Sequence, residues 1–167
     1  MNIEELYKKH YSDLYRFAYQ LSQSVDIAQD LVQEAFLKLG SQGRIKKGEI
    51  RNIKSWLFRV VHNTFITLKR REENHRRIES EIAYYETSET IPEKDFELEE
   101  RKRIIRDEMK KLSEFEYSLL ILYGDGVSYA DISEILNINK SSVGSYILRT
   151  RKKLAAVLKT RYHEMFK

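Results

Sequence analysis

Residues 128–153, SYADISEILNINKSSVGSYILRTRKK, have the pattern of two short helices joined by a tight turn. Ser128 followed three residues later by Asp131 is a capping box, in which each side chain satisfies a free backbone N–H at a helix start. Apolar residues then share one face of that helix from Ile132 onward. Asn139 follows a short turn and is well suited to cap a second helix. The stretch therefore predicts a helix-turn-helix.

The second helix of this pair has a polar, positively charged outer face. Its apolar residues Val143, Ile147 and Leu154 repeat at helical spacing and are expected to face inward. Between positions 140 and 161 the chain carries seven basic residues and no acid. A helix that is merely solvated usually mixes charge signs, because like charges at i and i+4 repel. Helix-turn-helix pairs also occur as ordinary packing units, but we favour DNA binding, since the major groove accepts such a face.

The composition predicts an all-α chain. The 167 residues include one proline and six glycines, so few positions interrupt a helix, and β-hairpin signals between alternating stretches are lacking. The chain has no cysteine, which excludes disulfides and thiolate metal sites and suits a reducing cytoplasm. The N-terminus is too charged for a signal peptide, and no apolar run approaches membrane-spanning length. We therefore expect a cytoplasmic protein.

Charge is distributed in blocks that suggest two domains. The formal net charge is only +4, yet residues 44–77 hold eleven basic residues and three acids, and residues 79–100 hold nine acids and one lysine. A basic block suggests contact with nucleic acid, and an acidic block suggests a solvated linker. We predict two small helical domains, residues 1–82 and 101–167, joined by an acidic linker at residues 83–100.

Apolar residues at helical spacing predict three helices in the N-terminal domain. The first begins at Ile3, the second covers residues 25–39 and the third covers residues 53–71. Asp30 and Glu34 stand at i and i+4 on the outer side of the second helix, where like charges cost a few tenths of a kcal/mol. Such a pair makes sense if a basic partner meets it, although a solvated acidic face is the commoner explanation.

Three stretches together resemble the extracytoplasmic-function group of bacterial RNA polymerase sigma factors. DIAQDLVQEAFLKL at residues 26–39 is similar to the helix of that family that binds core polymerase. SWLFRVVHNTFITLKRR at residues 55–71 is similar to the promoter-melting segment, and residues 112–154 are similar to the C-terminal DNA-binding domain. The order and spacing of the three stretches make the resemblance specific, and it covers nearly the whole chain apart from the linker.

The resemblance implies a promoter-specificity factor. Such a protein binds core RNA polymerase through the β′ clamp helices and the β flap, directs it to the minus-ten and minus-thirty-five elements of promoter DNA and helps to melt the promoter. An anti-sigma factor is implied as an inhibitory partner. The resemblance implies no catalysis, no cofactor, no metal and no small-molecule substrate, and a monomer when free.

The resemblance also assigns candidate site residues. Those for core-polymerase binding lie on the outer side of the second helix and are Asp30, Gln33, Glu34 and Lys38. Those for the minus-ten element are Arg59, Asn63, Lys69, Arg70 and Arg71. Asn63 stands where related proteins hold a flipped base, and an Asn amide offers two donors and an acceptor to a base edge. Those for the minus-thirty-five element are Lys140, Ser141, Ser142, Ser145, Leu148, Arg149 and Lys152.

The chain departs from the pattern of this family at several positions. Family members often carry a basic residue at the position of Gly144, an arginine at that of Tyr146 and an aspartate at that of Thr67. Gly144 lowers the stability of its helix by roughly 1 kcal/mol relative to alanine. We therefore expect the second helix of the helix-turn-helix to recognise an unusual DNA sequence.

Two other functions and one form of regulation are compatible with parts of the sequence. An autonomous helix-turn-helix regulator with an N-terminal dimerisation or ligand domain would predict a stable dimer and palindromic operators. A nuclease or hydrolase has little support, because the four histidines are scattered and neither an HExxH motif nor a glycine-rich phosphate loop is present. The acidic linker adjoins the basic block, so it could fold back on the DNA-binding face of the free protein.

Overall fold

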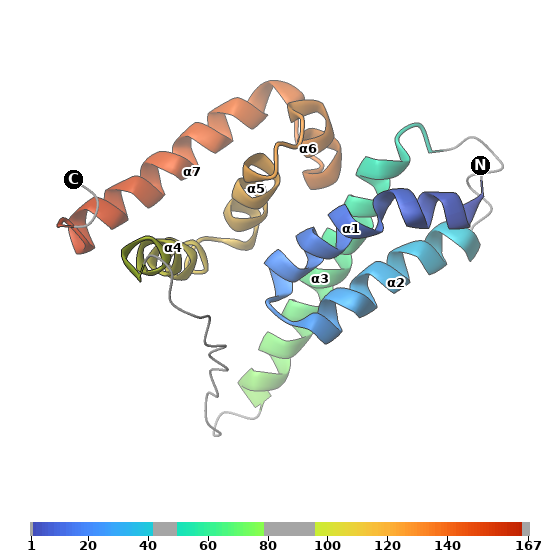
Figure 1. The fold of residues 1–167 in the computed structure, drawn as a ribbon, viewed down its shortest axis with the longest axis horizontal. Coiled ribbons are helices and arrows are strands. Elements are labelled where there is room, and N and C mark those ends of the chain that lie inside the picture. Colours follow the sequence, from blue (N-terminus) through green and yellow to red (C-terminus); the bar gives the residue numbers. More distant parts are fainter. Residues whose placement is uncertain (1, 42–49, 79–95, 165–167) are drawn as a thin grey trace.

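The computed structural model describes residues 2–41, 50–78 and 96–164, and this part of the chain folds into seven α-helices without a strand (Figure 1). The all-α prediction is confirmed. The helices in chain order are α1 (Ile3–Ser22), α2 (Val25–Ser41), α3 (Ile53–Ile78), α4 (Phe96–Met109), α5 (Glu114–Gly124), α6 (Tyr129–Leu136) and α7 (Lys140–Arg161). Within the described ranges, none of these helices has both the length and the apolar character needed to span a membrane.

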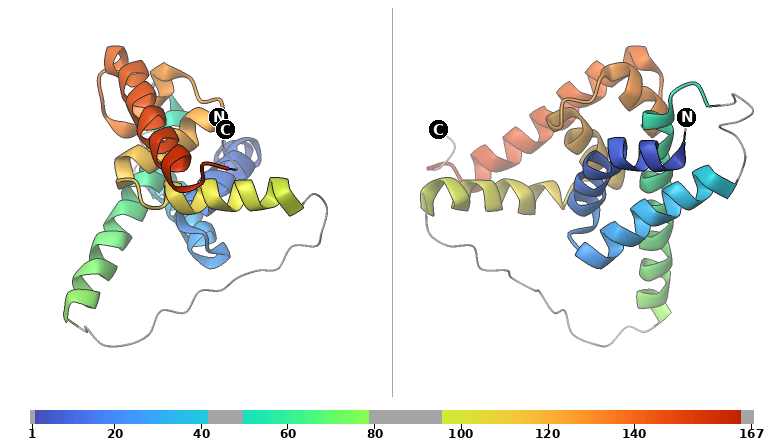
Figure 2. Two further views of the ribbon diagram at one scale, coloured as in Figure 1. Left: turned by 90° about the vertical axis from the view of Figure 1, so that its left-hand side faces the viewer. Right: turned by 45° about the vertical axis from the view of Figure 1, so that its right-hand side comes forward.

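Helices α1, α2 and α3 pack on one another and form the N-terminal domain (Figure 1). The helical spacing of apolar residues in the sequence is confirmed, because Leu14, Phe17, Leu31 and Leu57 are fully buried between the three helices. The side chain of Asn2 caps α1 by accepting a hydrogen bond from a backbone N–H of the first turn. Helix α3 continues seven residues beyond the predicted end at 71, and its last turns extend past α1 and α2 (Figure 2).

Helices α4 to α7 form the C-terminal domain. Ser128 caps α6, Asn137 ends it in the left-handed conformation with φ of 53°, and Asn139 caps α7, so the predicted helix-turn-helix is confirmed. The predicted capping box at α6 is only half present. The Ser128 hydroxyl accepts from the backbone N–H of Asp131, but the Asp131 carboxylate bonds to side chains instead of the Ser128 backbone.

A buried acid joins the two ends of the C-terminal domain. Glu108 on α4 is 3% exposed and accepts hydrogen bonds from Lys111 at 2.6 Å, from the Tyr162 hydroxyl at 3.1 Å and from Arg161 at 3.4 Å. The hydrogen bond from Lys111, with help from Tyr162 and Arg161, lowers the pKa of Glu108 despite the cost of burial. Helix α4 begins at Phe96, within the stretch predicted as a linker, and the linker residues before it lie outside the described ranges.

The two domains are in contact. Helix α3 packs against α6, and α1 packs against α5. Buried apolar side chains from both domains belong to one continuous hydrophobic cluster. The helix-turn-helix is therefore held next to the start of α3 in this structure.

Candidate nucleic-acid interface

Helix α7 presents the predicted DNA-contacting residues on its outer face. Val143, Ile147 and Thr150 on the opposite face are buried, and α5 and α6 pack against this helix. The start of α7 is fixed because the Asn139 side chain accepts hydrogen bonds from both the backbone N–H and the hydroxyl of Ser141, at 3.0 and 2.9 Å. Ser142 is half-buried, and the exposed members of the predicted set are Lys140, Ser141, Ser145, Leu148, Arg149 and Lys152.

The basic side chains of α7 divide into two groups. Lys153 bonds to both carboxylate oxygens of Glu116 on α5, at 2.8 and 3.0 Å, and this hydrogen bonding lowers the pKa of Glu116. Arg151 lies over the ring of Tyr123. In the described ranges no ion pair joins Arg149 or Lys152 to a carboxylate. Arg149 and Lys152, which face outward, are therefore available to bind an anionic partner.

Arg149 is held by an aromatic side chain that the sequence analysis did not assign to the site. Its guanidinium carbon lies 5.4 Å from the centre of the Tyr146 ring. The Tyr146 ring in turn meets Phe115 of α5 edge to face, with the ring centres 5.2 Å apart and an interplanar angle of 77°. The spacing of three residues between Tyr146 and Arg149 is the local signal that could have indicated this pair.

A pocket of about 500 Å³ lies between α2 and α3. Asn63 and Arg71, predicted for the minus-ten element, line it together with Glu34 and Lys38, predicted for polymerase binding. Glu34 and Lys38 form an ion pair at 2.6 Å, and Lys38 also donates to the Thr64 hydroxyl at 3.4 Å. The structure therefore brings two groups of predicted residues into one pocket, with Glu34 and Lys38 turned toward α3.

The remaining residues predicted for polymerase binding border an apolar surface. Asp30 and Gln33 are exposed on α2, and Gln33 lines a second pocket, of about 540 Å³, at the C-terminal end of that helix. The most exposed apolar side chain in this pocket is Leu37, at 71%. The other residues that line it are Ile3, Tyr7, Phe36, Gly40 and Ser41. Sequence analysis did not predict this apolar surface. Leu37, an apolar residue four positions after Gln33 on the polar face of α2, could have indicated it.

The residues predicted for the minus-ten element lie along α3. Asn63 is exposed, and Arg59 is half-buried. Burial lowers the pKa of the adjacent His62, whose Nε2 has no hydrogen-bond partner among the described residues, and so favours the neutral ring. The exposed basic residues at the projecting end of the helix are Lys69, Arg70 and Arg71.

Comparisons with known proteins match both domains. Residues 6–75 match the family model for sigma-70 region 2, and residues 102–154 match the model for sigma-70 region 4. The chain is 34% identical over 147 residues to the ECF RNA polymerase sigma factor EcfG of Rhodopseudomonas palustris (strain TIE-1), covering 85% of this chain and 77% of the relative. It is 26% identical over 160 residues to the ECF RNA polymerase sigma factor SigM of Bacillus subtilis (strain 168), covering 94% and 95%.

A solved structure has the same fold. It is the sigma factor RpoE of Bartonella quintana in complex with the anti-sigma factor NepR, and the match has a TM-score of 0.68 at 24% identity. The match covers 95% of this chain and 97% of that one, so both helical domains are included.

Proposed function

Because this chain belongs to the ECF group of RNA polymerase sigma factors, which are promoter-specificity initiation factors, we propose that its two domains engage polymerase and promoter at separate places. The single observation that carries this division is the exposed, acid-free face of α7 in the domain that matches sigma-70 region 4. The alternative of an autonomous regulator is not favoured, since the N-terminal domain matches sigma-70 region 2. We propose a monomer that acts by binding energy and works in the cytoplasm with polymerase.

In this proposal α7 recognises the minus-thirty-five element. Its outer face offers two kinds of contact, because basic side chains neutralise phosphates and position the helix, whereas polar side chains reach base edges. Lys140 and Lys152 are exposed cations at opposite ends of this face. Ser145 and Arg149 lie between them and would contact bases in the major groove.

The pocket between α2 and α3 is the proposed site for a base of the minus-ten element. Its volume of about 500 Å³ is within the range of small-ligand pockets and leaves room for a nucleobase. Asn63 on its rim can donate to and accept from a base edge. The half-buried Trp56 in its lining offers an aromatic face. The basic end of α3 would then contact the flanking phosphates.

The outer face of α2 is the proposed contact with the β′ clamp helices of polymerase. Asp30 and Gln33 supply polar groups there, and the exposed Leu37 supplies apolar area beside them. We further propose that the C-terminal domain contacts the β flap. An inhibitory protein that binds this chain, as NepR binds the related RpoE, is also part of the proposal.

Footprinting of a promoter by core polymerase with variants of this chain tests the division of labour. Arg149→Ala is expected to weaken protection of the upstream element without loss of polymerase binding. Asn63→Ala is expected to reduce promoter melting, measured by permanganate reactivity, while the upstream footprint remains. Lys9→Ala on the exposed side of α1 is the control. The division would be wrong if either site variant changed protection at the other element only.

A further inference from the structure

We propose that Tyr146 is a positioning residue that holds Arg149 in the orientation needed to bind a guanine in the upstream element. The inference rests on the proposed function of α7 as the helix that recognises that element. Arg149 is exposed and has no carboxylate partner within the described ranges. Its guanidinium carbon lies 5.4 Å from the Tyr146 ring centre, within the range of a cation–π contact.

The Tyr146 ring is itself fixed from behind. It is half-buried and meets Phe115 edge to face at 5.2 Å. Phe115 lies in the first turn of α5, where Ser113 and Glu116 form a complete capping box. The Glu116 carboxylate also bonds to Lys153 of α7 at 2.8 Å, one turn beyond Arg149. The first turn of α5 and the middle of α7 are therefore tied together, and the ring between them has little freedom to rotate.

This arrangement restricts the orientation of the guanidinium and leaves its N–H donors available for hydrogen bonds. A guanidinium that lies over a ring keeps its N–H donors in its own plane, free to point away from the protein. The bidentate partner that matches two parallel N–H donors in the major groove is guanine, through its O6 and N7 atoms.

Selection from a promoter library with a randomised upstream element, using holoenzyme assembled with core polymerase, tests the proposal. The wild-type chain is expected to enrich guanine at one position. Tyr146→Phe keeps the ring and should keep this preference, whereas Tyr146→Leu should reduce it at least about fivefold. Arg149→Ala removes the guanidinium donors, so it should lose the guanine preference without any change in folding.

The outcomes distinguish failure of this inference from failure of the proposed function on which it rests. The positioning role is overturned if Tyr146→Leu, shown by circular dichroism to be folded, enriches guanine as strongly as the wild type. It is equally overturned if Arg149→Ala, also folded, retains the preference. Failure of the wild-type holoenzyme to enrich any upstream sequence would instead contradict the proposed function of α7.

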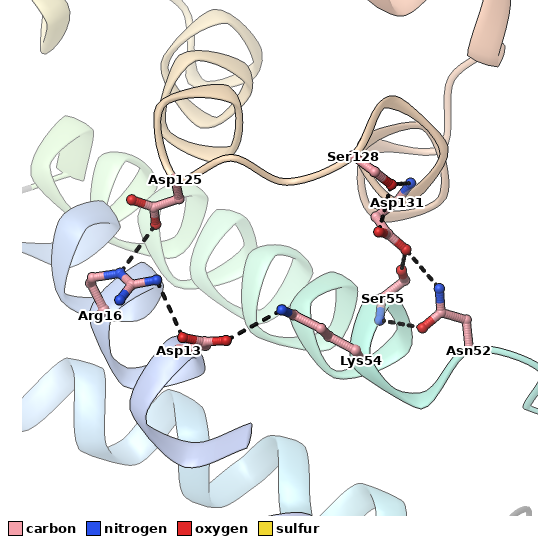
Figure 3. Close-up of polar contacts among 8 residues, drawn as sticks. All are labelled: Asp13, Arg16, Asn52, Lys54, Ser55, Asp125, Ser128 and Asp131. Carbon is pink, nitrogen blue, oxygen red and sulfur yellow. Dashed lines mark hydrogen bonds and ion pairs between the residues drawn. The ribbon is translucent and has the colours of Figure 1, made fainter. Parts of the chain in front are cut away.

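The contact between the domains carries a second, independent inference. The Asp131 carboxylate at the start of α6 accepts a hydrogen bond from the Ser55 hydroxyl at 2.6 Å and from the Asn52 amide at 2.7 Å, both at the start of α3 (Figure 3). On the neighbouring side, Arg16 of α1 lies 3.5 Å from the Asp125 carboxylate after α5 (Figure 3). These five residues are called the latch below.

The latch is a strong contact between the domains, although it would have to break for the domains to separate. Ser55 is 1% exposed, so its hydroxyl is shielded from water, whereas Asp131 is half-buried. The Tyr117 hydroxyl of α5 adds a hydrogen bond of 2.7 Å to the backbone oxygen of Gln20. The minus-ten and minus-thirty-five elements lie roughly 25 base pairs apart, or about 85 Å at 3.4 Å per base pair. Helix α6, whose eight residues span about 12 Å, packs on both α3 and α7, so the two DNA-binding helices lie far closer than that.

We infer that the latch is autoinhibitory and keeps the free chain in a closed form that cannot bind both promoter elements, again on the premise of the proposed function. The test is small-angle scattering of the free chain together with its binding to duplex DNA carrying both elements. Ser55→Ala combined with Arg16→Glu removes one hydrogen bond and places an acid opposite Asp125. This variant should be more extended than the wild type and bind the DNA at least about fivefold more tightly.

A matched control variant separates the effect of opening the latch from the effect of the changed charge. Lys8→Glu makes the same change of charge on α1. Within the described ranges the ion pair of Lys8 is with Glu4, one turn away, so this variant should leave the chain compact. The inference is overturned if the latch variant stays as compact as the wild type, or if it opens without any gain in DNA binding. The scattering result does not depend on polymerase, so a compact latch variant would leave the proposed function standing.

Discussion

Replacing Gly144 by alanine should stabilise the protein without changing its DNA binding. A glycine inside a helix costs about 0.8–1.0 kcal/mol relative to alanine, because it loses more backbone freedom on folding. An added Cβ at Gly144 would meet Cε2 of Tyr129 at 3.4 Å, which is an ordinary van der Waals contact. Tyr129 is 43% exposed, so its ring can adjust. The expected gain is about 1 kcal/mol, or a rise of roughly 2–4 °C in Tm for a chain of this size.

Urea unfolding and thermal melting measure this gain, and Ser145→Ala is the matched comparison. Ser145 is the next residue along α7, but it lies on the exposed face that is proposed to bind DNA. Its replacement should also raise helix stability, by up to about 0.7 kcal/mol, while it weakens binding of the upstream element by holoenzyme. A loss of stability in Gly144→Ala, or a loss of DNA binding equal to that of Ser145→Ala, would refute the assignment of Gly144 to the face packed on α6.

Three further predictions concern stability and pH. Leu57→Ala should lower the free energy of unfolding by about 2–5 kcal/mol, because Leu57 is fully buried, whereas Leu37→Ala should change it by less than about 0.5 kcal/mol, as urea titrations of the pair would reveal. Because the pKa of Glu108 is lowered in the folded protein, ionised Glu108 stabilises the fold above pH 4.5, the ordinary pKa of a glutamate, and this stabilisation is lost as the pH falls further. Glu108→Gln should therefore flatten the acid limb of a plot of stability against pH. The lowered pKa of His62 favours the neutral ring, so stability should fall as the pH drops below 6.5, and His62→Gln should remove that part of the slope.

Local patterns predicted five of the seven helices in the described residues, but not α4 and α5. The cap at Asn139 was foreseen because the chemistry that starts a helix lies within a few residues. The capping box of Ser113 and Glu116 was missed, although its spacing is equally local. The partner of Asp131 could not be foreseen in the same way, because Ser55 is 76 positions away and meets it only after both domains have folded.

The candidate site was predictable in its residue types more than in its geometry. Outward positions on α7 followed from helical periodicity. The orientation of Glu34 and Lys38 toward Thr64 did not, because it depends on how α3 crosses α2. Periodicity also identifies a face without identifying what lies beneath it, so the aromatic support of Arg149 by Tyr146 was not predicted.

Transcription by purified core RNA polymerase, with and without this chain, tests the central claim most directly. The account predicts that the chain binds the polymerase and that specific transcripts from a promoter carrying both elements appear only in its presence. A polymerase that neither binds the chain nor starts transcripts in response to it would contradict the account.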